Sequence, residues 1–175
     1  MKIFGLTGWS GSGKTTLVRH LVPALIRRGL TVSTMKHAHH GFDMDKPGKD
    51  SYVHREAGAV EVMVSSRNRW VLQHENREVP EPSMEELLQF MTPVDLVLVE
   101  GYKSYPHDKL EVYRTATGKP LMAAENPTIV AVATDAPSDL RLSIPVLDLN
   151  DAEAVADFVI ARCGLLKVRT HGAAE

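Results

Sequence analysis

Residues 8–16 read GWSGSGKTT and match the pattern G-x-x-x-x-G-K-S/T at every fixed position. In folded proteins this pattern joins a buried strand to a helix, and its backbone N–H groups surround a phosphate. The neighbouring sequence agrees with this context. The apolar run KIFGLT precedes the pattern at residues 2–7, and Leu17, Leu21 and Leu25 follow it at helical spacing. The stretch therefore predicts a phosphate-binding loop between a strand and a helix.

The residues of this loop suit the parts of a bound nucleoside triphosphate. Glycines let successive N–H groups curl round a phosphate without a Cβ clash, and the start of a helix adds a partial positive charge. Lys14 is expected to reach the β- and γ-phosphates, the Thr15 hydroxyl to bind Mg²⁺, and Thr16 to contact the α-phosphate side. The alternative is a glycine-rich turn that binds nothing. The expected nucleotide-binding residues of the loop are Gly8, Ser10, Gly11, Ser12, Gly13, Lys14, Thr15 and Thr16.

A site of this kind also needs an acidic residue at the end of another buried strand. The apolar run VDLVLVE at residues 94–100 ends in Glu100, and Gly101 follows. A carboxylate at this place can hold Mg²⁺ or its water, and a glycine N–H can approach the γ-phosphate. Glu100 is therefore a second candidate site residue, with Gly101 beside it. The alternative is a glutamate that faces solvent at the end of a strand.

Residues 36–51, KHAHHGFDMDKPGKDS, gather His37, His39 and His40 with three aspartates, and they allow three interpretations. A structural metal site is one, although the histidine spacing is poor and no cysteine lies nearby. A solvated polar loop is another. The third, which we favour, is a switch segment in which Asp43 or Asp45 orients Mg²⁺ or the attacking water. That interpretation places the end of the strand at 31–36 near the phosphates, provided that this strand neighbours the first.

Strands and helices alternate along the chain, which predicts an α/β fold with a mostly parallel sheet and helices on both faces. The pattern predicts helices at 14–28, 51–58, 83–91 and 151–163, with Ser83 and Glu86 forming a capping box. It predicts that residues 59–66 and 69–75 form two strands that pair with each other, and that residues 165–175 form a flexible tail. Further strands are expected at 31–36, 94–100, 109–115, 128–134 and 144–149.

Composition places the chain in an ordinary class. It has 175 residues, 43% of them hydrophobic, a net charge of −2 and one cysteine, Cys163. One domain of residues 1–175 is expected, without the basic charge of a nucleic-acid binder. No apolar run approaches the roughly 20 residues of a membrane helix. A soluble protein in the reducing cytoplasm is the expectation.

Three motifs together carry a family resemblance: GWSGSGKTT, the block KHAHH with DMDKPGKDSY, and DLVLVEGYK. From about residue 3 to residue 160 the chain resembles the molybdopterin-guanine dinucleotide biosynthesis adaptor family, called MobB. The resemblance implies a P-loop NTPase fold and a GTP-binding homodimer with weak GTPase activity. It implies a helper role when a separate nucleotidyltransferase attaches GMP to molybdopterin. Whether molybdopterin itself contacts this chain stays open.

Carried onto this sequence, the resemblance implies catalytic roles for Lys14, Glu100 and one of Asp43 and Asp45. It implies Mg²⁺ ligation by Thr15 and Glu100, with Asp43 as a third candidate. Guanine selectivity in this class needs an acid, and Asp135 stands where one is expected, after the run TIVAVAT. The chain reads A-T-D there instead of N-K-x-D. The alternative for Asp135 is a turn residue.

Two other functions use the same loop. One is a metallochaperone GTPase, favoured by the histidines at 37–40. The other is a small-molecule kinase, which usually carries an arginine-rich lid, whereas the late region offers only Arg114 and Arg141. No arginine is expected to reach the phosphates in cis. Arg55, Arg67 and Arg69 are candidates only if a loop or a second subunit brings them in, so slow hydrolysis is expected.

Overall fold

The computed structural model describes residues 1–38 and 41–165, so the expected tail lies outside the described residues except for Leu165. The described chain forms two compact units. The larger contains the residues up to 38 and those from 93 onward, and the smaller contains residues 41–92. Folding as a single domain stays a prediction. Within the described residues, no helix has the length and apolar character needed to cross a membrane.

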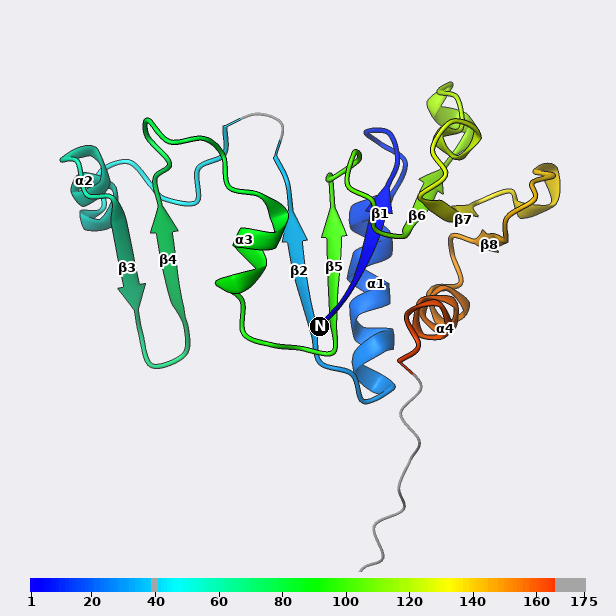
Figure 1. Cartoon of the computed structure of the whole chain (residues 1–175), viewed down its shortest axis with the longest axis horizontal. Helices are drawn as coiled ribbons and strands as arrows, with labels where there is room; N and C mark the ends of the chain where they lie inside the picture. Colours follow the sequence, from blue (N-terminus) through cyan, green and yellow to red (C-terminus); the bar gives the residue numbers. More distant parts are fainter. Residues whose placement is uncertain (39–40, 166–175) are drawn as a thin grey trace, which may run out of the picture. The chain divides into compact units, whose positions relative to one another are not determined.

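The larger unit contains a six-stranded parallel sheet, in the order β2-β5-β1-β6-β7-β8 (Figure 1). The predicted α/β class and parallel sheet are confirmed. One condition of the switch interpretation is not met, because β5 lies between β1 and β2. The strands are β1 (Lys2–Thr7), β2 (Val32–Lys36), β5 (Leu96–Glu100), β6 (Lys109–Tyr113), β7 (Ile129–Thr134) and β8 (Val146–Asp148).

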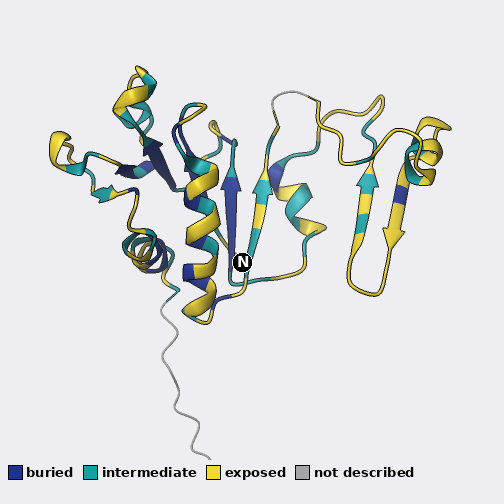
Figure 2. Ribbon diagram, turned by 180° about the vertical axis from the view of Figure 1, so that it is seen from behind, coloured by how far each residue is buried: buried dark blue, intermediate teal, exposed yellow. Residues whose placement is uncertain are grey.

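Two helices, α1 (Lys14–Arg27) and α4 (Ala152–Cys163), pack on one face of this sheet. Phe4 and Leu6 of β1 and Leu98 of β5 belong to the same buried core as the inner residues of both helices. Figure 2 shows buried and exposed positions alternating along α1, as expected for a helix with one apolar side. Each such buried side chain contributes about 1.5–3 kcal/mol. This packing fixes the start of α1 beside the end of β1.

The opposite face of the sheet is covered by short segments. Glu111 alternates with the core residues Leu110 and Val112, so it points to this second face. Its carboxylate accepts hydrogen bonds from the backbone N–H groups of Met122 (2.9 Å) and Ala123 (2.7 Å). These residues begin the 3₁₀ helix η2 (Met122–Ala124). Helices therefore contact both faces, α1 and α4 on one and η2 on the other.

The smaller unit contains an antiparallel hairpin and two short helices. The hairpin strands β3 (Glu61–Ser65) and β4 (Trp70–His74) pair as predicted. The helices are α2 (Asp50–Glu56) and α3 (Met84–Gln89). The capping box at α3 is confirmed, because Ser83 Oγ accepts from Glu86 N and Glu86 Oε2 accepts from Ser83 N.

Candidate nucleotide-binding site

The loop of residues 8–13 connects β1 to α1 at the carboxyl edge of the sheet, where ligands bind in open parallel sheets. Gly8 has φ 141°, and a Cβ there would lie 2.4 Å from the Val112 carbonyl oxygen. A side chain at this position would force the loop or strand β6 to shift, so the glycine allows β6 to approach the loop closely. Helix α1 begins at Lys14, and within the described chain no side chain caps its first turn. Its free N–H groups suit an anion.

Two polar groups inside the loop fit a phosphate. Lys14 Nζ donates to the carbonyl oxygens of Gly8 and Trp9, both at 2.9 Å, so the ammonium lies against the loop. Burial lowers the pKa of Lys14, and the nearby Glu100 carboxylate raises it in part. Ser12 Oγ is buried and has no hydrogen-bond partner among the described residues. A buried hydroxyl without a partner costs about 1–3 kcal/mol, and a phosphate oxygen is a suitable acceptor for it.

Glu100 lies at the same edge as the loop. It pairs in register with Leu6 of β1 and with Lys36 of β2. Its side chain is 20% exposed, and Lys36 Nζ lies 4.0 Å from Oε1. The Glu100 carboxylate is also close enough to Lys14 to raise the pKa of that lysine in part. Thr15 and Thr16 are exposed on the first turn of α1, and the hydroxyl of Thr15 and the carboxylate of Glu100 are oxygen donors of the kind that Mg²⁺ prefers.

Gly101 permits the close approach of β2 and β5 at this edge. Its φ is 98°, and a Cβ there would lie 2.7 Å from the His37 carbonyl oxygen. His37 N donates to the Glu100 carbonyl at 2.9 Å, which extends the pairing of the two strands beyond their ends. The first residues after both strands therefore lie side by side, next to the predicted Mg²⁺ ligand.

Trp9 has two cationic neighbours that the sequence did not indicate. Its indole N–H donates to the Pro120 carbonyl at 2.8 Å. The ammonium groups of Lys103 and Lys119 lie 5.5 and 5.7 Å from its ring centroid, within cation–π range. Burial is the main cause that lowers the pKa of Lys14, and the positive charges of Lys103 and Lys36 lower it further. Several positive charges therefore lie near the loop, which suits a polyphosphate.

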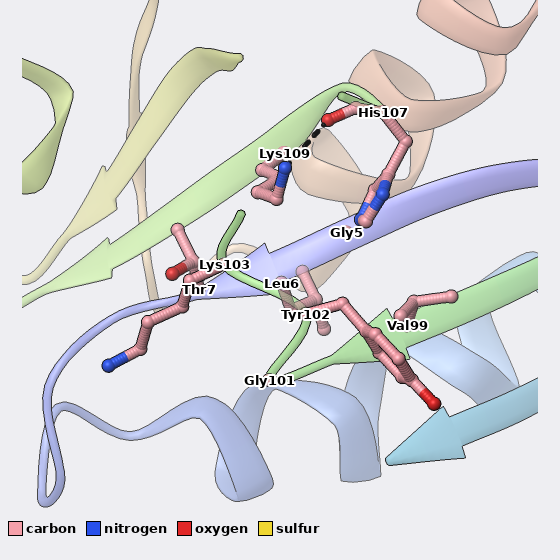
Figure 3. Close-up of a pocket in the computed structure, with 9 residues that line it drawn as sticks. All are labelled: Gly5, Leu6, Thr7, Val99, Gly101, Tyr102, Lys103, His107 and Lys109. Carbon is pink, nitrogen blue, oxygen red and sulfur yellow. Dashed lines mark hydrogen bonds between the residues drawn. The ribbon is translucent and has the colours of Figure 1, made fainter. Parts of the chain in front are cut away.

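A buried lysine fixes the segment that follows Glu100. Lys109 is 2% exposed. Its ammonium donates to the carbonyl oxygens of Tyr105 and His107 and to Thr128 Oγ1, the last two at 3.0 and 2.9 Å. Figure 3 shows Lys109 and His107 close to Gly5, where a Cβ would lie 2.6 Å from the His107 ring. Burial lowers the pKa of Lys109. The segment of residues 101–108, which carries Gly101 and Lys103, is thus held against β1.

Asp135 is linked to the loop through Arg114, a residue that sequence reasoning missed as a site residue. Arg114 Nη1 donates to Asp135 Oδ2 at 3.2 Å, and its Nε donates to the Ser12 carbonyl at 3.1 Å. Arg114 also lines a pocket of about 130 Å³ with Gly13, Thr16, His20 and Asn150 among its other residues. From sequence it lay inside the strand expected at 109–115, whereas in the structure β6 ends at Tyr113 and Arg114 follows it directly.

Asp43 and Asp45 belong to the smaller unit, and both have partners within it. Arg55 Nη2 donates to Asp43 Oδ2 at 3.2 Å, and Ser51 Oγ donates to Asp45 Oδ1 at 2.7 Å. Arg55 also lies 3.6 Å from Glu75, so carboxylates of its own unit balance its charge. A role of Asp43 or Asp45 at Mg²⁺ stays a prediction.

The histidine run is only partly described. His37 follows β2, whereas His39 and His40 lie outside the described residues. Within the described part of the chain, no group of three or more His, Cys, Asp or Glu side chains could hold a metal ion. The metal-site interpretation of 37–40 therefore stays a prediction.

A phosphate-type loop between the first strand and the first helix, with an acidic residue ending the neighbouring strand, defines the P-loop NTPase fold class. The family described as molybdopterin guanine dinucleotide synthesis protein B, MobB, matches residues 3–135, and the chain belongs to this family.

Individual relatives agree with the family assignment. A protein of Escherichia coli named molybdopterin-guanine dinucleotide biosynthesis adapter protein is 42% identical over 161 residues, covering 90% of this chain and 91% of that protein. A Haemophilus influenzae protein of the same name is 42% identical over 160 residues, covering 90% and 86%. The crystal structure of a MobB homolog from Bacillus stearothermophilus is similar with a TM-score of 0.68 at 27% identity, covering 95% of this chain and 100% of that one. The resemblance found in the sequence is confirmed.

Proposed function

We propose that this protein is a GTP-binding adapter with weak GTPase activity in the biosynthesis of molybdopterin-guanine dinucleotide. Family membership over residues 3–135 supports the pathway, and the name of the Escherichia coli relative supports the adapter role. Nucleotide binding is supported above all by the geometry of the loop. Its buried Ser12 hydroxyl has no partner among the described residues, its Lys14 ammonium lies against the loop, and both groups fit a phosphate.

The roles of the residues follow from their positions. Lys14 and the N–H groups at the start of α1 would bind the β- and γ-phosphates and stabilise the charge that develops on the transferred phosphoryl group. Thr15 and Glu100, with Asp43 as the further predicted ligand, would hold Mg²⁺. The ion, when bound, neutralises phosphate charge. The N–H of Gly101 would approach the γ-phosphate.

Hydrolysis is expected to be slow in the isolated chain. A cation that stabilises the transition state can raise such rates by about 10³–10⁵, and Arg55, the candidate nearest the switch block, is already bound by carboxylates. A separate nucleotidyltransferase, which attaches GMP to molybdopterin, is the proposed partner. We also propose a homodimer, as the resemblance implies.

The adapter role can be tested by reconstitution. The nucleotidyltransferase of the same organism would be supplied with molybdopterin, GTP and Mg²⁺, and attachment of GMP would be measured with and without this protein. We expect the protein to raise the yield and Lys14→Ala to raise it much less. Equal yields with wild type and with no added protein would refute the adapter role. Equal yields with wild type and Lys14→Ala would refute a need for nucleotide binding in it.

A further inference from the structure

The Arg114 side chain donates from Nε to the Ser12 carbonyl at 3.1 Å, and this contact joins residues 102 positions apart in the sequence. The guanidinium approaches closely because Gly13 has no side chain, since a Cβ there would lie 3.2 Å from Arg114 Nε. A second nitrogen, Nη1, donates to Asp135 at 3.2 Å. The side chains of Arg114 and Asp135 are 34% and 33% exposed, so both are half-buried.

The hydrogen bond at Ser12 fixes the orientation of a peptide unit in the phosphate loop. The unit that joins Ser12 to Gly13 is planar and trans, so the Gly13 N–H points opposite to the Ser12 carbonyl. Because Arg114 binds that carbonyl, the N–H points away from Arg114. Loops with this pattern use such N–H groups to bind the α- and β-phosphates.

We propose that Arg114 is a positioning residue, which holds the Gly13 N–H toward the phosphates, and that Asp135 holds Arg114 in place. On this account Asp135 acts through Arg114 and does not read the base. The chain lacks the N-K-x-D pattern after β7, and the Arg114–Asp135 pair links the loop after β7 to the phosphate loop instead. The inference rests on the proposed nucleotide binding and adds residues to that site.

The two roles of Asp135 predict different results when its carboxylate becomes an amide. If Asp135 accepts hydrogen bonds from the guanine N1–H and 2-amino group, the variant with an amide should prefer xanthine, which has an oxygen in place of the 2-amino group. If Asp135 only holds Arg114, the same substitution should change the affinity for nucleotides of all bases by the same factor. The two roles can be separated by measuring the binding of GTP, GDP and XTP to wild type and to four variants. These are Arg114→Ala, Arg114→Lys, Asp135→Asn and the double variant Arg114→Ala/Asp135→Asn. Arg141→Ala is the matched control, since it removes a positive charge whose guanidinium donates to the carbonyl oxygens of Ser138 and Leu140.

We expect Arg114→Ala to weaken the binding of GTP and of GDP by the same factor, about tenfold, because a hydrogen bond from a charged group is lost. Arg114→Lys should also lose affinity, because an ammonium cannot replace the planar fork. Asp135→Asn should weaken GTP and XTP equally, and the double variant should match Arg114→Ala, because the two residues act as one unit. Arg141→Ala should bind like wild type, and melting temperatures should show that all variants fold.

Several results would overturn the inference. These are a switch to XTP in Asp135→Asn, full GTP affinity in Arg114→Ala, full affinity in Arg114→Lys, or additive losses in the double variant. If wild type prefers ATP, the guanine part of the proposed function fails, and the same variants measured with ATP and ADP still decide the role of Arg114. If wild type binds no nucleotide, both proposals fail.

Discussion

Replacement of Gly8 by alanine tests the close packing between the phosphate loop and strand β6. The new Cβ would lie 2.4 Å from the Val112 carbonyl oxygen and 2.9 Å from Ser12 Oγ. A carbon and a carbonyl oxygen normally approach to about 3.3 Å, so the backbone of β6 or of the loop has to move by roughly 0.9 Å. The strained φ of 141° adds about 1–3 kcal/mol, and overpacking adds about 1–3 kcal/mol.

The expected destabilisation of Gly8→Ala is therefore about 2–6 kcal/mol, a large part of a typical total of roughly 5–15 kcal/mol. For a chain of this size that corresponds to a fall in Tm of roughly 5–20 °C, measured by circular dichroism. Gly118→Ala is the control, because its φ is 63° and a Cβ there meets no atom within 4 Å. It should cost only about 1–2 kcal/mol. Equal melting temperatures for the two variants would refute the reasoning about the loop.

Three further predictions concern single side chains. Lys14→Ala should abolish tight GTP binding with little change in Tm, measured by calorimetric titration and thermal unfolding, and wild-type affinity would show that this lysine does not bind phosphate. Glu100→Gln should spare GTP binding and slow phosphate release, whereas unchanged turnover would move the Mg²⁺ role to Asp43 or Asp45. Burial raises the pKa of Glu111 above its usual value of 4.5. As the pH rises, Glu111 therefore loses its proton more readily in the unfolded chain than in the folded one, which favours unfolding. The free energy of unfolding of wild type should fall relative to that of Glu111→Gln between pH 4.5 and pH 7. Urea unfolding at both pH values measures this, and a difference that does not change with pH would contradict it.

The local parts of the fold were predictable from sequence because their signals are local. The apolar run of β1, the glycine pattern and the leucine spacing of α1 lie within about thirty residues of each other, and each agrees with the structure. The strand expected at 109–115 is present as β6, Lys109–Tyr113, whereas the strand expected at 144–149 is shorter, Val146–Asp148. Boundaries depend on pairing with neighbours, which a single segment does not encode.

The relations between distant segments could not be predicted in the same way. The place of β5 between β1 and β2 depends on long-range pairing, and the switch interpretation of residues 36–51 had required that β2 lie next to β1. A lone arginine near the end of a predicted strand belongs to no motif, so the role of Arg114 was found only through its contacts with Ser12 and Asp135. Spacing alone also did not reveal that Arg55 binds Asp43.

The most direct test of the account is a titration of the purified protein with GTP and with ATP, with and without Mg²⁺, while phosphate release is followed in the same samples. We predict Mg²⁺-dependent binding that prefers GTP, with slow release of phosphate. Equal or tighter binding of ATP would contradict the GTP-binding adapter and favour the small-molecule kinase, and absence of binding to either nucleotide would contradict the assignment of the phosphate loop.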